Sequence, residues 1–98
     1  MIHYGFDWDS AKASANLKKH GISFDEAKSV FLDVYAEESF DVDHSAGEDR
    51  FMIIGMSERD RVLVVSFTLP DHKTIRIISA RRANVRERHD YEKEIGNP

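Results

Sequence analysis

The eight residues Ile75 to Arg82, with the sequence IRIISARR, combine an apolar run with three arginines. Such isoleucine-rich runs are typical of strands, where β-branched side chains pack against neighbouring strands. Each guanidinium in the strand needs water, a carboxylate or a phosphate, because burying an unpaired charge is costly. The segment therefore predicts a buried strand at which positive charge is concentrated. It leads directly into a charged helix, expected over residues 83–95.

Length and composition indicate a single compact domain over residues 1–98, because 41% hydrophobic content is enough for one modest core. The chain has no cysteine, which excludes disulfides and thiolate metal sites and suits a reducing cytoplasm. No apolar run approaches the roughly 20 residues that span a bilayer, and the N-terminus is no signal peptide. We therefore expect a soluble cytoplasmic protein with no membrane partner.

The net charge of −4 argues, taken alone, against nucleic-acid binding. The distribution of charge is more informative than the sum. Residues 33–49 contain seven acidic residues and no Lys or Arg, whereas residues 76–88 contain five arginines and one glutamate. The molecule is therefore electrically polarised. The acidic segment would repel RNA, so we expect it to face solvent or a basic segment of a partner.

Two helix signals lie in the first third of the chain. Asp9 is a plausible N-cap for a first helix, and Gly21 is well placed as its C-terminal stop. Ser23 and Glu26 match the capping box, in which the serine hydroxyl and the glutamate carboxylate both accept hydrogen bonds from free amides. Apolar residues at helical spacing then predict a second helix that ends near residue 32.

The rest of the chain has the pattern of strands followed by the final helix. Strands are expected at 34–42, 50–57, 61–69 and 74–82, the first of them partly exposed. Short polar turns join the last three strands, which predicts an antiparallel meander. Two helices, three or four strands and one helix indicate an α+β fold, with helices packed on one antiparallel sheet.

Strand geometry limits which arginines can act together. Arg76 and Arg81 lie roughly 17 Å apart along their strand and point to opposite faces, unless a bulge or the strand end redirects Arg81. Arg50 begins a strand that runs parallel to that of Arg76, two places away, so the two lie at one end of the sheet, roughly 10 Å apart. They are candidates for one site. Whether they share a face depends on hairpin register, because a slip of one residue reverses the face.

Short motifs spread over nearly the whole chain form a specific pattern when they are taken in order. They are Phe6-Asp7-Trp8-Asp9, Asn16, Lys19-His20-Gly21, Phe24 with Ala27, Asp49-Arg50-Phe51 with Gly55, and Ile75-Arg76-Ile77-Ile78-Ser79-Ala80-Arg81 followed by Glu87 and Tyr91. Their order and spacing resemble the BrnT family of type II toxins. The resemblance implies a RelE-like fold, metal-independent RNA cleavage that inhibits translation and growth, and neutralisation by a BrnA-like antitoxin. Because that antitoxin family has a ribbon-helix-helix DNA-binding domain, promoter DNA is expected to be bound only through the toxin–antitoxin complex.

Metal-independent RNA cleavage uses the 2′-hydroxyl as the nucleophile, so the protein must stabilise phosphoryl charge and move protons. Guanidinium groups suit the first task because they stay charged and donate two hydrogen bonds to one phosphate. Arg50 and Arg76 are the first catalytic candidates, and Arg81 is the next. For proton transfer, His20 is the best-placed imidazole, at a helix end beside Lys19, although the general base stays open. This chemistry implies no cofactor.

Four further residues are candidates for RNA binding: Lys19, Arg82, Arg86 and Tyr91. The arginines among them also fit the solvated face of the last helix, where neighbouring carboxylates are local partners. Tyr91 could stack on a base, but an aromatic ring beside a sheet more often belongs to the core.

The catalytic candidates have structural alternatives as well. His20 can simply cap the first helix, because an imidazolium is favoured at a helix C-terminus. Arg50 can pair with Asp49 or Glu48, and an exposed pair of that kind is worth only about 0 to 1 kcal/mol. For Arg76 the alternative is a buried ion pair.

The sequence also offers a candidate metal site and an alternative to the ribonuclease function. The segment 41–44, with the sequence DVDH, offers two carboxylates and an imidazole, but no fourth ligand is in view and an acidic surface is the simpler interpretation. No metal site is predicted. The functional alternative is a non-catalytic interaction module, whose basic strand and helix bind an acidic partner and whose acidic segment binds a basic one.

Overall fold

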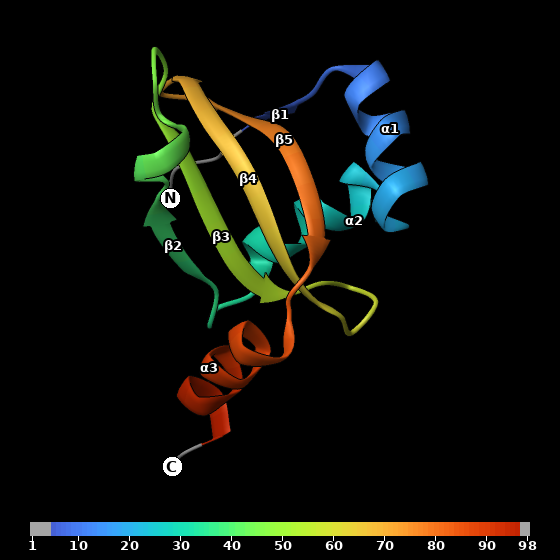
Figure 1. Ribbon diagram of the computed structural model, residues 1–98, viewed down its shortest axis with the longest axis vertical. Coiled ribbons are helices and arrows are strands. Elements are labelled where there is room, and N and C mark those ends of the chain that lie inside the picture. The colour runs from blue at the N-terminus through green and yellow to red at the C-terminus, as the bar shows by residue number, and fades with distance from the viewer. Residues whose placement is uncertain (1–4, 97–98) are drawn as a thin grey trace.

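The computed structural model describes residues 5–96, which form a five-stranded sheet with one helix on one face, a second helix beside one edge and a third helix at one end (Figure 1). The strands are β1 (Gly5–Asp7), β2 (Glu37–Phe40), β3 (Arg50–Met56), β4 (Val62–Asp71) and β5 (Thr74–Arg82). The helices are α1 (Ser10–His20), α2 (Phe24–Ser29) and α3 (Val85–Gly96), with short 3-10 helices η1 (Val30–Leu32) and η2 (Val42–His44). The α+β class predicted from the sequence is confirmed. None of the described helices is long and apolar enough to cross a bilayer.

The sheet has one strand more than the sequence predicted. Its order is β1-β5-β4-β3-β2, and β2 to β5 form the expected antiparallel meander. The additional strand β1 pairs in parallel with β5, so the sheet is mixed and the expectation of a purely antiparallel sheet is wrong. Because β1 has only three residues, it is too short to show a strand period in the sequence.

The first predicted helix is confirmed at both of its ends. The Asp9 carboxylate accepts a hydrogen bond from the Lys12 amide at 3.0 Å, as an N-cap does. Gly21 ends the helix in the left-handed conformation with φ of 70°, which glycine adopts without steric cost. These caps therefore work as the local sequence predicted.

The capping box predicted for the second helix forms only in half. The Ser23 hydroxyl accepts from the Glu26 amide at 3.0 Å, but the Glu26 carboxylate turns to the β3–β4 hairpin. There it accepts from the Ser57 hydroxyl at 2.7 Å and from Nε of Arg61 at 2.9 Å. Burial alone would raise the pKa of Glu26, but the bonds from Arg61 and Ser57 outweigh burial and hold this pKa below its usual value. A buried carboxylate needs such partners, so the long-range pair replaces the local one.

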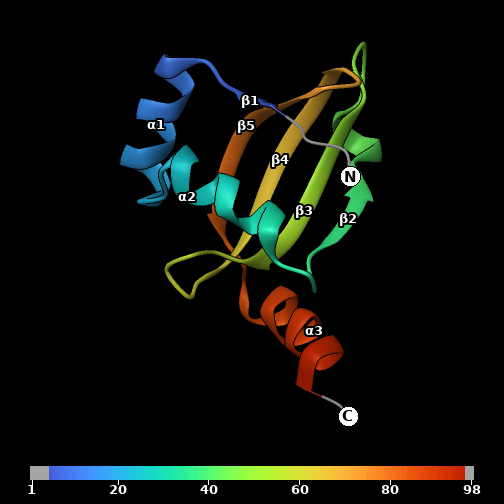
Figure 2. The same ribbon diagram turned by 180° about the vertical axis from the view of Figure 1, so that it is seen from behind.

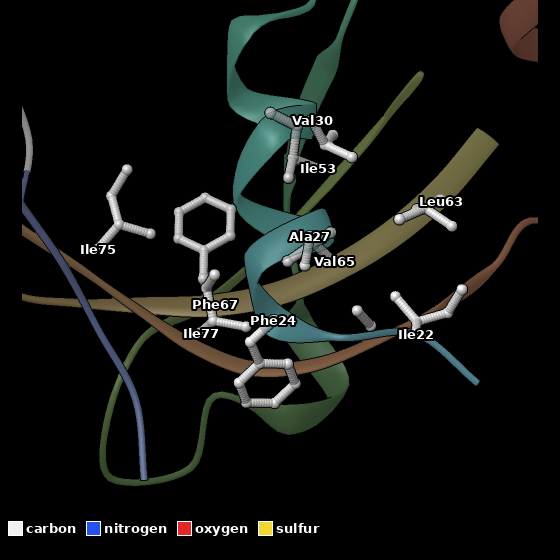
Figure 3. Packing of buried hydrophobic residues seen from close by; sticks show 11 residues of the cluster. Ile22, Phe24, Ala27, Val30, Ile53, Leu63, Val65, Phe67, Ile75 and Ile77 are labelled. Carbon is white, nitrogen blue, oxygen red and sulfur yellow. The ribbon is translucent and has the colours of Figure 1, made fainter. Parts of the chain in front are cut away.

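The core lies between α2 with η1 and one face of the sheet, while α1 lies beside the edge of β5 (Figure 2). It is built from these side chains of the helical region and of β3, β4 and β5: Ile22, Phe24, Ala27, Val30, Ile53, Leu63, Val65, Phe67, Ile75, Ile77 and Ala80 (Figure 3). Because side chains of successive residues on a strand alternate in direction, the strand residues that lie between the core residues point to the opposite face of the sheet. Helix α3 covers one end of that opposite face (Figure 1). We call it the open face.

A buried asparagine fixes where α1 lies along β5. The Asn16 amide donates to the Ala80 carbonyl at 2.9 Å, and its Oδ1 accepts from the Ala80 amide at 3.1 Å. The same side chain donates to the Ile22 carbonyl at 3.0 Å. Asn16 therefore binds backbone groups of β5 that lie past the short stretch paired with β1, as a neighbouring strand would. The C-terminal half of α1 is held beside Ala80.

Candidate functional site

Strand pairing places Arg50, Thr68 and Arg76 in one row across the open face. The register pairs Arg50 with Thr68 on β4, and Thr68 with Arg76 on β5. The core residues Phe67 and Ile75 directly precede Thr68 and Arg76, so this row faces away from the core. The prediction that the two arginines lie at one end of the sheet is confirmed, and the register gives them the same face. We call Arg50, Thr68 and Arg76 the arginine row.

The Arg50 side chain is partly buried and forms no ion pair or hydrogen bond within the part of the chain that the structure describes. Its backbone is fixed on both sides: the Arg50 amide donates to the Ser45 hydroxyl at 3.0 Å, and its carbonyl accepts from the Asp41 amide at 2.8 Å. The alternative in which Arg50 pairs with Asp49 or Glu48 is therefore not seen. Its guanidinium is available for a ligand on the open face.

Arg76 is held by a carboxylate from the strand that the sequence did not predict. Its Nη2 lies 3.0 Å from Oδ2 of Asp7 on β1, and this hydrogen bond raises the pKa of Arg76. The two side chains are 44% and 45% exposed, so the pair is not the buried ion pair considered as an alternative. A guanidinium has five N–H donors, and Asp7 occupies only some of them. Asp7 can therefore orient Arg76 while the remaining donors face a ligand.

Between the two arginines, Thr68 is 1% exposed. Its Oγ1 is buried and has no hydrogen-bond partner among the described residues. Buried hydroxyls in proteins almost always have a partner, so an unpaired one between two guanidiniums is informative. The arginine row thus combines two cations with a hydroxyl whose hydrogen-bonding capacity the protein itself does not use.

Arg81 lies on the same face as Arg76, so the prediction of opposite faces is wrong. Phe67 of β4 pairs with Ile77, but the preceding Ser66 pairs with Ser79, which leaves Ile78 as an extra residue. Because of this bulge, every later residue of β5 points to the face opposite to the one it would have in a regular strand. It is the exception under which the sequence argument allowed Arg81 to turn. Arg81 pairs across the sheet with Val64, on the open face.

Unlike Arg50, Arg81 is held by a carboxylate through both of its terminal nitrogens. Its two terminal nitrogens donate to the Glu87 carboxylate at 2.7 and 2.9 Å. Glu87 also accepts from the Asn84 amide at 2.8 Å, while the Asn84 side chain accepts from the Glu87 amide at 2.8 Å. This is a complete capping box at the start of α3, which the sequence analysis missed although Asn84 and Glu87 have the right spacing. Arg81 therefore ties the start of α3 to β5.

The structure does not bring His20 to the arginine row. His20 is the last residue of α1, and Asn16 holds this end of α1 beside Ala80. Arg76 lies nearer the beginning of β5, and α1 lies beside the edge of β5 rather than over the open face (Figure 1). His20 is only partly buried and Lys19 is exposed, a placement that agrees with the helix-capping alternative.

The remaining RNA-binding candidates divide into exposed and buried residues. Arg82 and Arg86 are exposed, one at the end of β5 and the other in the first turn of α3. Tyr91 is only 3% exposed, and its hydroxyl donates to Oδ2 of Asp33. Burial and this bond raise the pKa of Tyr91. A base cannot stack on this ring while α3 keeps its place, so the structure shows the core role that was the alternative for Tyr91.

Asp33 is the anchor that holds this part of α3. Besides the Tyr91 hydroxyl, it accepts from the Met56 amide at 2.7 Å and from the Tyr35 amide at 2.9 Å. Burial alone would raise the pKa of Asp33, but these hydrogen bonds outweigh burial and hold it below its usual value. Gly55 makes the close approach possible, because a Cβ there would lie 3.1 Å from Oδ2 of Asp33 and 2.9 Å from Cβ of Ala36.

An imidazole and a carboxylate that the sequence analysis assigned to an acidic surface lie beside the arginine row. Nδ1 of His44 is 3.0 Å from Oδ2 and 3.1 Å from Oδ1 of Asp41. The Asp41 amide donates to the Arg50 carbonyl, so the pair directly adjoins Arg50. A carboxylate on Nδ1 favours the tautomer that leaves Nε2 as the proton acceptor. Within the described part of the chain, no three His, Asp or Glu residues are grouped so as to hold a metal ion.

Comparisons with known proteins show the family and the fold of the chain. A family model described as "Ribonuclease toxin, BrnT, of type II toxin-antitoxin system" matches residues 8–87. Among solved structures, the crystal structure of the Brucella abortus ribonuclease toxin BrnT is similar to the chain, with a TM-score of 0.63 and 23% sequence identity. The match covers 86% of this chain and 99% of that one. At this identity the likeness shows a shared fold. A search of curated proteins gave no match.

Proposed function

Because the chain belongs to the BrnT family of ribonuclease toxins of type II toxin–antitoxin systems, we propose that it cleaves RNA at the arginine row, without a metal ion. One observation carries the choice of site. The free guanidinium of Arg50, the unpaired hydroxyl of Thr68 and the oriented guanidinium of Arg76 lie side by side on the open face. The cleavage is proposed to inhibit translation and arrest growth.

The arginine row suits an RNA phosphate in charge and in spacing. Two intervals between neighbouring strands put the backbones of Arg50 and Arg76 about 10 Å apart, so their long side chains can approach one phosphate from both sides. Charge-assisted hydrogen bonds from guanidinium groups are about twice as strong as neutral ones, and they strengthen as negative charge develops on the phosphoryl oxygens. The Thr68 hydroxyl is buried between them, so it can add a third donor only when the side chains that cover it move aside.

Cleavage also needs proton transfer. The 2′-oxygen loses its proton as it attacks phosphorus, and the 5′-oxygen gains one as the bond between phosphorus and that oxygen breaks. We assign these transfers to His44, because its imidazole is oriented by Asp41 and the Asp41 amide is bonded to the Arg50 carbonyl. His20, the candidate from the sequence, remains the second choice because it lies toward the other end of β5.

The wider partners follow from the same proposal. Among the exposed cations at the far end of the sheet, Arg86 on α3 can extend an RNA path beyond the catalytic row. Lys19 on α1 and Arg82, which pairs with Leu63 of the core, point away from the open face and can contact only RNA that bends around the edge of the sheet. Arg81 borders this path while it holds α3. A BrnA-like ribbon-helix-helix antitoxin would neutralise the toxin and would supply the contacts to promoter DNA. Because its substrate is cellular RNA, the proposed place of action is the cytoplasm.

The direct test compares the purified chain with Arg76→Ala on RNA in the presence of EDTA. Removing one electrostatic contact to the transition state typically lowers the rate by about 100 to 1,000-fold. Arg59→Ala is the matched control, because it removes the same charge from an exposed position in the turn between β3 and β4, which belongs to no part of the proposed RNA path. Full cleavage by Arg76→Ala would overturn the site. Intact RNA with the wild type, even at high protein concentration, would favour the interaction module.

Growth provides a second readout in cells. Expression of the wild type in a bacterial host is expected to arrest growth and degrade RNA together, whereas Arg76→Ala is expected to permit growth with intact RNA. Circular dichroism of the purified variant must show a wild-type fold, since an unfolded variant would also be harmless.

A further inference from the structure

A groove lies between α3 and the open face, at the end of the sheet away from the arginine row. It has a volume of about 220 Å³. Its lining comes from β2, β3, β4 and α3: Glu37, Ser39, Met52, Ile54, Val64, Glu87, Asp90 and Tyr91. The floor, on β3 and β4, is apolar, whereas the rim carries carboxylates.

The charge of this groove is unsuited to RNA. Its lining includes three carboxylates and no Lys or Arg. Arg81 pairs with Glu87, and Nδ1 of His89 lies 3.9 Å from Oδ1 of Asp90, so the rim still presents the carboxylates of Glu37 on β2 and Asp90 on α3 to an occupant of the groove. Carboxylates repel phosphates and attract cations, so an occupant that combines basic and apolar side chains matches both the rim and the floor.

One wall of the groove is an edge strand. β2 pairs with β3 on one side, and no strand of the described chain covers its other side. All four of its residues, Glu37–Phe40, are exposed. An uncovered edge presents free backbone donors and acceptors, to which an extended segment of another protein can add as a further strand.

Exposed apolar side chains continue this surface along the chain. Leu32 is 83% exposed, Val34 is 88% exposed and Tyr35 is 52% exposed, directly before β2. Asp33 in the same loop is bonded to Tyr91 of α3, so the loop lies beside the helix that borders the groove. Neighbouring apolar residues that remain exposed commonly mark a protein contact.

We propose that this surface binds an extended segment of the antitoxin that carries Lys or Arg among apolar residues. The segment adds to the free edge of β2, places its basic side chains against Glu37 and Asp90, and covers Leu32 and Val34. The proposal rests on the toxin–antitoxin part of the function and not on the catalytic assignment. A segment bound here occupies the face that carries the arginine row, so it obstructs an RNA strand that crosses the sheet.

The test is a titration of the toxin with the antitoxin encoded beside its gene. The double variant Glu37→Lys with Asp90→Lys is expected to bind at least about tenfold more weakly, because like charges then face each other across the contact. The matched control is Asp25→Lys with Glu58→Lys, which changes the total charge equally at exposed residues on α2 and on the β3–β4 turn. The control pair is expected to bind like the wild type.

Amide hydrogen exchange in the complex reports on the added strand. Amides of residues 37–40 that point away from β3 are expected to become protected when the antitoxin binds. Unchanged affinity of the double variant, equal weakening by the control pair, or unprotected β2 amides would each overturn the proposal. So would loss of RNA cleavage by the double variant with antitoxin binding intact, because the groove would then belong to the RNA path. These binding readouts remain interpretable even if the wild type does not cleave RNA.

Discussion

The two ends of the open face use the same kinds of residue for opposite purposes. At the arginine row, Arg50 has no partner among the described residues and Thr68 has an unused hydroxyl. At the α3 end, both terminal nitrogens of Arg81 are bonded to Glu87, and Tyr91 is bonded to Asp33. What a charged or aromatic side chain can do is therefore decided by what the fold places opposite it. A guanidinium without an ion pair can bind a ligand, whereas one that is bonded to a carboxylate of the same chain holds two elements of the fold together.

Removing one arginine from each end of the open face gives the largest expected difference in cleavage rate and in stability. Arg50→Ala should lower RNA cleavage about 100 to 1,000-fold and leave thermal unfolding nearly unchanged, because its side chain has no intramolecular partner to lose. Arg81→Ala should instead destabilise the fold and keep most of the rate per folded molecule. Single-turnover cleavage and thermal melts of both variants measure this contrast. A well-folded Arg81→Ala that loses as much activity as Arg50→Ala would erase the distinction between the ends.

The histidines test the same contrast for proton transfer. His44→Gln should lower the cleavage rate about 100-fold, because the backbone of Asp41, which orients His44, is bonded to that of Arg50. Asp41→Asn should lower the rate less, since it removes the carboxylate that orients Nδ1 but keeps the imidazole. His20→Gln is the control at the other end and should cleave RNA at the wild-type rate. If only His20→Gln lowers the rate, the general base belongs to the α1 end.

A hydroxyl deletion measures what Tyr91 contributes at the α3 end. Tyr91→Phe keeps the ring but removes the donor to Asp33, which should lower the free energy of unfolding by about 1 to 2 kcal/mol. Cleavage should persist, because the ring is not needed to stack on RNA. Tyr35→Phe is the control: its backbone amide, rather than its hydroxyl, bonds Asp33, so stability should hardly change. Urea denaturation at neutral pH compares the two. Equal stabilities would remove the anchor role of Tyr91.

Features set by neighbouring residues were predictable from the sequence. The caps at Asp9 and Gly21 depend on residues within one helical turn, and both form as expected. The strand over Thr74–Arg82 also has the predicted bounds, because its apolar run is long and strongly patterned. The common end of Arg50 and Arg76 followed from the meander topology, which short turns determine.

Features set by distant contacts were not predictable. Nothing in the composition of the strand marks Ile78 as a bulge, yet that residue decides the face of Arg81. The partner of Arg76 was missed because Asp7 belongs to a three-residue strand that exists only through its pairing with β5. Likewise, the spacing of Ser23 and Glu26 matches a local capping box, but in the folded chain the Glu26 carboxylate accepts a hydrogen bond from Arg61 instead. The sequence thus predicted which end of the sheet carries the candidate site, whereas the strand register and the long-range partners determine which side chains meet there.

The smallest expected effect concerns how acid acts on the α3 end. The pKa of Glu87 is held below its usual value chiefly by the bond from Arg81, against the effect of burial, and that of Asp33 is lowered as well. A carboxyl group with a depressed pKa in the folded state contributes stability above its unfolded pKa, and this contribution is lost as the pH falls through the folded value. With usual values of 4.5 for Glu87 and 3.8 for Asp33, the loss should begin near these values and continue below them. Unfolding free energies measured from about pH 5 down to about pH 3 should fall less steeply for Glu87→Gln with Asp33→Asn than for the wild type. Equal slopes would mean that these carboxylates do not make α3 sensitive to acid.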